Sequence, residues 1–174
     1  MPNWTHNSWL ITPTEQEGSV AQMDRLIDAM PEGGDRFIEA LFPMPDEFRP
    51  TGEIGKQDYY VPKINGDTWH EWQTKNWGVK WGDCETTMEV VDRGQGLRSI
   101  HLNFDTPWDM PRPIIAQLAT EYPALRFEIE GLFEHDGYHE GERLVLETGA
   151  GVVETSHFEN PDCHCYDCDP ASYE

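Results

Sequence analysis

The sequence predicts an α+β fold of the ferredoxin-like type, a split β-α-β sandwich with an antiparallel sheet and helices on one of its faces. Apolar residues alternate along several short segments and repeat at helical spacing in others. These segments follow one another in the order strand, helix, strand, strand, helix, strand, which is typical of this sandwich. A chain of 174 residues with 37% hydrophobic content can bury one core, so we expect a single domain.

The first strand is expected over residues 4–11. Ser19 and Gln22 have the spacing of a capping box, which predicts a helix over residues 19–30 with apolar residues at helical spacing. Pro31 and the glycines after it end this helix. Residues 36–42 are predicted as a short helix or strand.

An insertion around residues 46–80 interrupts the pattern. Residues 46–67 are rich in glycine, proline and polar residues, which indicates a loop. Thr68 and Glu71 form a second capping box, which predicts an inserted helix in the segment TWHEWQTKNW.

The second half of the chain supplies the remaining elements. Strands near 85–91 and 97–105 flank the turn sequence DRGQG and predict a β-hairpin. A helix over residues 113–122 begins at a proline, and two more strands are expected over 127–133 and 142–148. The predicted domain therefore covers residues 1–148, and residues 149–174 form an acidic, cysteine-rich tail.

The charge of the chain limits its partners. It holds 33 acidic and 12 basic residues, for a net charge of −21, and residues 126–174 contribute 13 acids and two arginines, or −11. This field repels phosphate backbones and anionic membranes, so we expect no direct nucleic-acid binding and a protein partner with a basic surface. Solubility alone is the competing explanation.

Location follows from what the sequence lacks. It contains no run of about 18 apolar residues and no secretory signal at its start. We therefore expect a cytoplasmic protein without a membrane segment. In a reducing cytosol, the four cysteines stay free or bind metal.

The tail sequence DCHCYDCD predicts a structural zinc site. Cys163, Cys165 and Cys168 have CxC and CxxC spacing, and His164, His157 or Cys84 completes a tetrahedral set. A disordered tail with idle thiols is the alternative, and a redox CxxC is a weaker one. His135 and His139 have HxxxH spacing, but the glycine between them favours a solvated loop.

Aromatic residues are concentrated in one segment. Trp69, Trp72, Trp77 and Trp81 form either a ligand platform or part of the core, and packing is the preferred interpretation. Trp108 is predicted to plug the space between the sheet and the following helix. The single histidines His6, His70 and His101 are interpreted as structural.

Four phrases, taken in order, resemble the YubB ferredoxin-like family of phage and plasmid proteins. They are MPNW with Asn7, LFPMPDE, NWGVKWGD, and FDTPWDMP followed by a helix and FEIEG. The likeness runs over about residues 1–148 and implies a ferredoxin-like domain without an iron-sulfur cluster and without known catalytic residues. Members commonly begin MPNWC, whereas this chain has Thr5, and the tail after Gly149 is not a feature of the family core.

No P-loop, GxSxG, GxGxxG or HExxH motif occurs in the sequence. The leading hypothesis is a phage or mobile-element accessory protein that binds a host or viral protein, and in a narrower form its acidic face mimics DNA. The alternatives are a metal-dependent enzyme that uses the tail cysteines or the His135–His139 loop, and a virion component.

Overall fold

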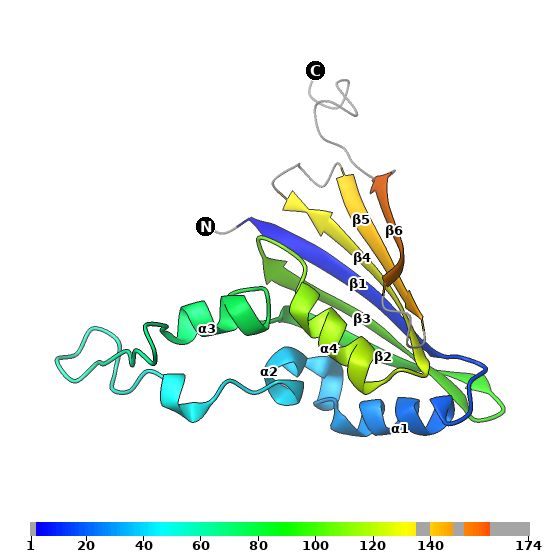
Figure 1. Cartoon of the computed structure of the whole chain (residues 1–174), viewed down its shortest axis with the longest axis horizontal. Helices are drawn as coiled ribbons and strands as arrows, with labels where there is room; N and C mark the ends of the chain where they lie inside the picture. The colour runs from blue at the N-terminus through cyan, green and yellow to red at the C-terminus, as the bar shows by residue number, and fades with distance from the viewer. Residues whose placement is uncertain (1–2, 135–139, 148–151, 161–174) are drawn as a thin grey trace, which may run out of the picture.

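The computed structural model describes residues 3–134, 140–147 and 152–160. Strands β1 to β6 form one antiparallel sheet, and helices lie against one of its faces (Figure 1). The strands are β1 (Trp4–Pro13), β2 (Cys84–Gly94), β3 (Leu97–Pro107), β4 (Leu125–Phe133), β5 (Glu140–Glu147) and β6 (Val152–Glu159). The helices are α1 (Ser19–Ala29), α2 (Phe37–Leu41), α3 (Trp69–Asn76) and α4 (Arg112–Glu121), with 3-10 turns at Glu32–Gly34 and Asp46–Phe48.

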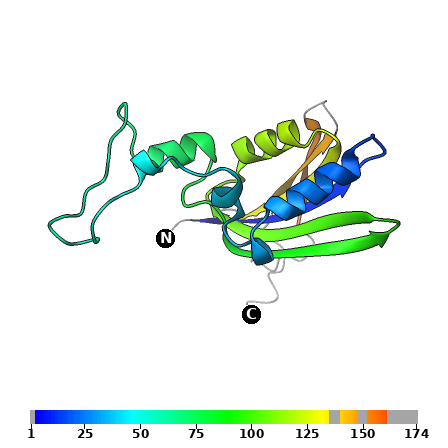
Figure 2. The same cartoon turned by 90° about the horizontal axis from the view of Figure 1, so that it is seen from below.

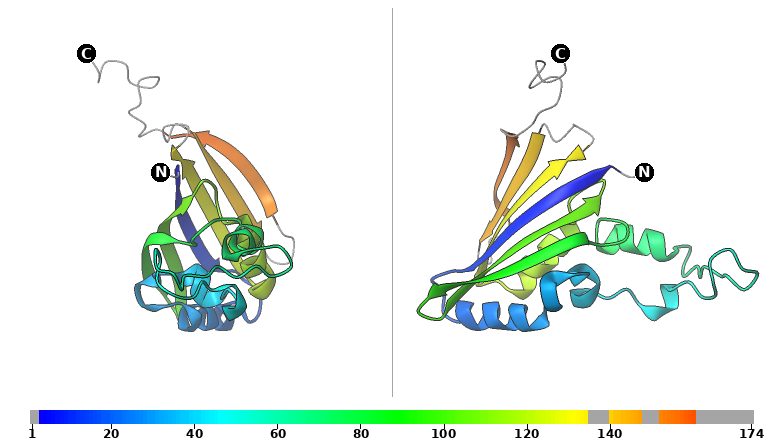
Figure 3. Two further views of the ribbon diagram at one scale, coloured as in Figure 1. Left: turned by 90° about the vertical axis from the view of Figure 1, so that its left-hand side faces the viewer. Right: turned by 180° about the vertical axis from the view of Figure 1, so that it is seen from behind.

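The strand order is β2-β3-β1-β4-β5-β6, so the first strand lies in the middle of the sheet. Strands β4, β1, β3 and β2 make the ferredoxin-like arrangement, with β1 antiparallel to both β3 and β4. The predicted hairpin is confirmed, since β2 pairs with β3 and Met88 lies opposite Leu102. The views from the front and from behind place α1 and α4 on the same face of the sheet, as predicted (Figures 1 and 3).

The core lies between the sheet and these helices. Alternate residues of the central strands point into it, and each is almost completely buried: Trp9, Ile11, Ile100, Leu102, Phe127 and Ile129. Trp9, Phe37 and Phe104 meet edge to face, with ring centroids 5.0–5.7 Å apart. Period-two alternation puts their neighbours in the strands on the opposite face, which none of the described helices covers (Figure 3).

The insertion extends away from the body of the molecule, and α3 connects it back to β2 (Figures 1 and 2). The capping box at Thr68 and Glu71 is confirmed. The one predicted at Ser19 and Gln22 is wrong, because Gly18 is the N-cap of α1. The Ser19 hydroxyl donates instead to the Thr14 carbonyl at 2.7 Å, and the Gln22 side chain accepts from the Ala124 amide at 2.9 Å.

The sheet continues past the predicted domain boundary at residue 148. The sequence placed strand β6 in the tail. In the structure this strand pairs with β5, so that Glu140 lies opposite Glu159 at one end and Leu146 lies opposite Val152 at the other. The first part of the predicted tail therefore belongs to the sheet, while residues 161–174 lie outside the described residues. None of the described helices is both long and apolar enough to span a membrane.

Candidate functional site

A groove runs across the uncovered face of the sheet. Its volume is about 610 Å³, and its lining residues range from Glu85 on β2 to Phe158 on β6. The residues that line it come from four strands, β1 to β4, and from the end of β6: His6, Asn7, Ser8, Glu85, Asn103, Phe104, Asp105, Glu130, Leu132, Phe158 and Asn160.

Carboxylates and apolar side chains share this groove. Glu85, Asp105 and Glu130 supply negative charge, and the His6 ring is hydrogen-bonded to Asp105 through Nδ1. Leu132 and Phe158 supply apolar surface. The Phe158 ring lies directly over Gly141 in the paired strand, where a Cβ atom would collide with it. The groove therefore combines negative charge with apolar surface.

Two arginines, one on β4 and one on β5, pair with carboxylates on the same two strands beside the groove. Arg126 donates to Glu128 at 2.9 Å and also binds Glu147, while Arg143 donates to Glu128 at 2.5 Å. Hydrogen bonds from Arg126 and then Arg143 lower the pKa of Glu128. Glu130 is 3.7 Å from the Arg143 Nε atom. The excess negative charge that sequence counting assigned to residues 126–174 is thus partly paired on β4 and β5.

Trp81 and Trp108 form an exposed aromatic pair, so the prediction that Trp108 plugs the core and the preferred interpretation that Trp81 packs in it are both wrong. Trp81 is 45% exposed and Trp108 is 51% exposed, and their ring centroids are 6.2 Å apart at an interplanar angle of 35°. Both residues have φ of 70°, in the left-handed region that costs a side-chain-bearing residue about 1–2 kcal/mol. Met110 fills the core instead, 1% exposed and packed against Gly131.

The other tryptophans of the cluster belong to the core, as the preferred interpretation predicted. Trp77 is 1% exposed, and its indole N–H donates to the Phe42 carbonyl at 2.9 Å. Trp69 and Trp72 are partly buried, and Trp72 meets Trp77 edge to face at 5.7 Å. The same segment, NWGVKWGD, therefore places one tryptophan inside the molecule and one on its surface.

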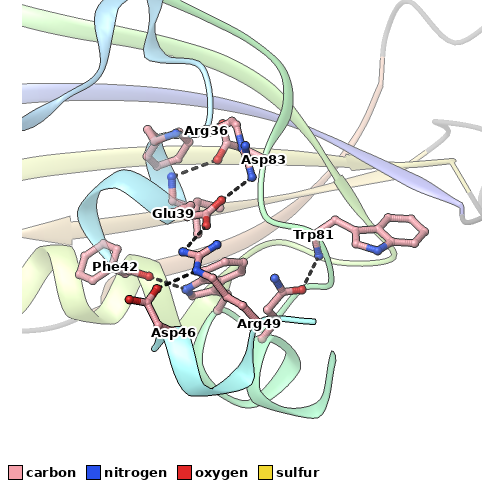
Figure 4. Close-up of polar contacts among 11 residues, drawn as sticks. Arg36, Glu39, Phe42, Asp46, Arg49, Trp81 and Asp83 are labelled. Carbon is pink, nitrogen blue, oxygen red and sulfur yellow. Dashed lines mark hydrogen bonds and ion pairs between the residues drawn. The ribbon is translucent and has the colours of Figure 1, made fainter. Parts of the chain in front are cut away.

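Polar contacts fix the chain on either side of Trp81 (Figure 4). The Trp81 amide donates to the side chain of Gln73 at 3.1 Å. Two residues on, Asp83 accepts from the backbone amides of Phe37 and Ile38 at the start of α2 and from the Thr86 hydroxyl. Figure 4 shows the Trp81 ring pointing away from this polar cluster.

The predicted zinc ligands fall into two groups. Cys163, His164, Cys165 and Cys168 lie outside the described residues, as do His135 and His139. Cys84 and His157 are described, and they lie on the opposite edge strands β2 and β6, with four strands between them. At about 4.8 Å per strand, the two side chains cannot bind the same ion, so at most one of them completes a site with the tail cysteines.

The protonation state of Cys84 bears on which of these two residues could complete a zinc site. Burial, followed by the negative charges of Asp83 and Asp105, raises the pKa of its thiol, and zinc binds the thiolate. His157 lies opposite Glu142, six positions before Cys163. Within the described ranges, no group of three or more His, Cys, Asp or Glu side chains is placed to hold a metal ion.

Sequence reasoning missed the groove and the exposed pair. His6 was interpreted as structural, yet it lines the groove beside Asp105. The alternation of polar residues on the central strands was the available signal, because it predicts a face without helices. No local signal distinguishes Trp81 and Trp108 from the buried Trp77, because their exposure depends on backbone dihedrals.

Residues 70–166 match the family model described as a ferredoxin-like domain in Api92-like proteins. The matched stretch begins in α3 and contains β2 to β6, whereas β1, which lies between β3 and β4, precedes it. The complete sheet of this chain therefore includes a strand from outside the matched stretch. No curated protein and no solved structure matches the chain.

Proposed function

This chain belongs to the family of Api92-like proteins that share a ferredoxin-like domain, and from that premise we propose that it acts by binding a protein with a basic surface. The observation that carries the proposal is the acidic groove across the uncovered face of the sheet. Such a face offers a broad, concave surface held rigid by the strands beneath it. Its three carboxylates and the net charge of −21 favour a partner of opposite charge.

The groove also supports binding through apolar contacts. Leu132 and Phe158 line it between the charged residues, and burial of apolar surface contributes to most protein–protein association. Charges at the rim chiefly raise the association rate and select the partner. We therefore propose a partner whose basic side chains pair with Glu85, Asp105 and Glu130 while an apolar residue contacts Leu132 and Phe158.

We further propose an origin in a phage or plasmid, with action in the host cytoplasm. The resemblance to the YubB family supports this origin. Three of the phrases that carry the resemblance meet at one end of the molecule: Trp4 lies opposite Pro107, the Trp108 amide donates to the Asn3 carbonyl at 2.8 Å, and Trp81 stacks beside Trp108. A convergence of this kind is expected where a family shares a binding surface.

The test is affinity capture from host lysate at two salt concentrations with two matched variants. One variant carries Glu85→Gln, Asp105→Asn and Glu130→Gln in the groove. The control carries Glu15→Gln, Glu17→Gln and Glu53→Gln, which make the same charge change at exposed positions away from the groove. Charges are screened over about 8 Å at physiological salt and about 3 Å at 1 M, so capture should weaken at high salt.

The groove variant should lose the partner, and the control should keep it. A partner retained equally by both variants at both salt concentrations would contradict the proposal, because apolar contacts elsewhere would then carry recognition. The narrower hypothesis of DNA mimicry predicts in addition that double-stranded DNA competes with the protein for the captured partner.

A further inference from the structure

The exposed pair of Trp81 and Trp108 has the geometry of a site for a cation. Trp81 lies between α3 and β2, and Trp108 follows β3 directly, so segments far apart in sequence bring the two rings together. Both residues hold the left-handed backbone conformation, and both side chains stay about half exposed. Residues held in sparsely populated backbone conformations cluster at functional sites, which makes this exposed pair a candidate for one.

The chain itself indicates which chemistry fits the pair. The ammonium group of Lys80 lies 4.5 Å from the Trp81 ring centroid and 5.9 Å from that of Trp108, within the range of a cation–π contact. Among the described residues, the ammonium group of Lys80 contacts these two rings and pairs with no carboxylate. The aromatic rings are thus the partners that hold this cation.

The spacing of the rings decides where a guest can lie. Their centroids are 6.2 Å apart, and a planar group placed between two rings needs roughly 7 Å, because optimal carbon contacts are about 3.5 Å on each side. A guest therefore lies over the outer face that both rings share, where Lys80 now lies. A cation is the guest that the negative field of this chain attracts there.

We propose that Trp81 and Trp108 bind a lysine or arginine side chain of the partner, and that this side chain displaces Lys80. The inference rests on the proposed function, which supplies a partner with a basic surface. The groove and the pair are neighbours in the sequence, since Asp105 near the end of β3 lines the groove and Trp108 follows that strand directly.

The test uses the protein labelled with 5-fluorotryptophan and three short peptides that differ in one central residue. This residue is arginine, lysine or glutamine, and each peptide carries the same flanking basic residues. Trp81→Phe and Trp108→Phe variants assign the two fluorine resonances. Peptide binding as such is followed separately by fluorescence anisotropy, so the groove and the aromatic pair are measured independently.

The arginine and lysine peptides should shift both resonances more than the glutamine peptide, because all three peptides share the same flanking basic residues and differ only in the central side chain. Lys80→Met removes the internal competitor and should tighten binding of the arginine peptide by about two- to fivefold, the range that an exposed cation–π contact supplies. Lys56→Met, in the insertion loop, makes the same charge change and serves as the control. Its effect on affinity should be smaller than that of Lys80→Met.

Three results would overturn the inference. The first is that no peptide shifts the two fluorine resonances, and the second is that the glutamine peptide shifts them as much as the arginine peptide does. The third is that a short oligothymidine shifts them instead. Normal anisotropy together with silent resonances would leave the proposed function standing and reject only the aromatic site. Loss of peptide binding in the anisotropy measurement, with every peptide, would instead count against the proposed function.

Discussion

Arg112 binds both carboxylate oxygens of Glu142, with Nη1–Oε1 at 3.1 Å and Nη2–Oε2 at 2.5 Å. This fork joins the first residue of α4 to β5, two elements 30 positions apart in sequence. Glu142 is only 8% exposed, and the hydrogen bonds from Arg112 lower the pKa of its carboxyl group below the ordinary value of 4.5. The pair therefore holds the outer strands against the helical layer.

Glu142→Gln should lower the free energy of unfolding by about 1–2 kcal/mol at neutral pH, because Arg112 then loses a charged acceptor. Since the folded-state pKa of Glu142 is lowered, its contribution is complete above the unfolded pKa and is lost as pH falls through the folded pKa. Urea unfolding of both proteins at pH 7 and in acid measures the difference between them. A difference that stayed constant over this range would contradict the assignment.

Asp83→Ala should destabilise the protein by about 2–3 kcal/mol, because it leaves the buried Phe37 and Ile38 amides without their acceptor. Asp83 is 6% exposed. Asp46→Ala is a suitable control, since that side chain is 96% exposed and its pair with Arg49 contributes about 0–1 kcal/mol. Equal losses in thermal stability for the two variants would show that Asp83 does not anchor α2.

Trp77→Ala should cost about 3–5 kcal/mol, because it opens a cavity in the core and removes the hydrogen bond to the Phe42 carbonyl. Trp81→Asn should change stability by less than about 1 kcal/mol, since asparagine tolerates the left-handed backbone and the tryptophan ring is half exposed. Chemical denaturation measures the free energy of unfolding of both variants. A large loss for Trp81→Asn would assign that ring to packing and weaken its role in binding.

Zinc should be present at about one ion per chain after purification without chelators, since structural zinc is held by on the order of 10 kcal/mol. Cys84→Ser should leave the zinc content unchanged, because burial and nearby carboxylates disfavour the Cys84 thiolate. Removal of residues 161–174 should abolish it. Elemental analysis measures the zinc content, and less than about 0.2 zinc per chain would favour a tail whose thiols bind no metal.

His157→Ala completes this experiment, because His157 and Cys84 lie on opposite edges of the sheet. Loss of zinc in this variant would identify His157 as the fourth ligand. Unchanged zinc in both single variants would leave His164 as the fourth ligand of the set that the sequence predicts. Loss in Cys84→Ser alone would show that the tail folds back to β2.

Local patterns predicted most of the elements. Turn residues between two alternating segments were enough to predict the β2–β3 hairpin, and the spacing of Thr68 and Glu71 was enough to predict where α3 begins. Both signals act within a few residues, and at these two positions the structure keeps the local contacts that they predict. The capping box at Ser19 failed because distant contacts intervened: the Gln22 side chain bonds to Ala124, 102 positions away.

The groove could not be predicted in the same way. Its residues come from β1, β2, β3, β4 and the end of β6, and they meet only because β1 lies between β3 and β4. Strand β6 itself was missed, because its polar sequence, VVETSHFE, has no strong alternation of apolar residues. It is held by pairing with β5, which sequence periodicity does not report.

The sequence by itself determined the ferredoxin-like order of elements, the single core and the large negative charge, because periodicity, turn chemistry and composition are properties of neighbouring residues. Only the tertiary structure decided which tryptophans are buried and which carboxylates share a surface. Trp77 and Trp81 are four positions apart, yet one packs in the core and the other stacks on Trp108. The physical reason is that burial depends on backbone dihedrals and on long-range neighbours, and neither is encoded in the spacing of residues along the chain.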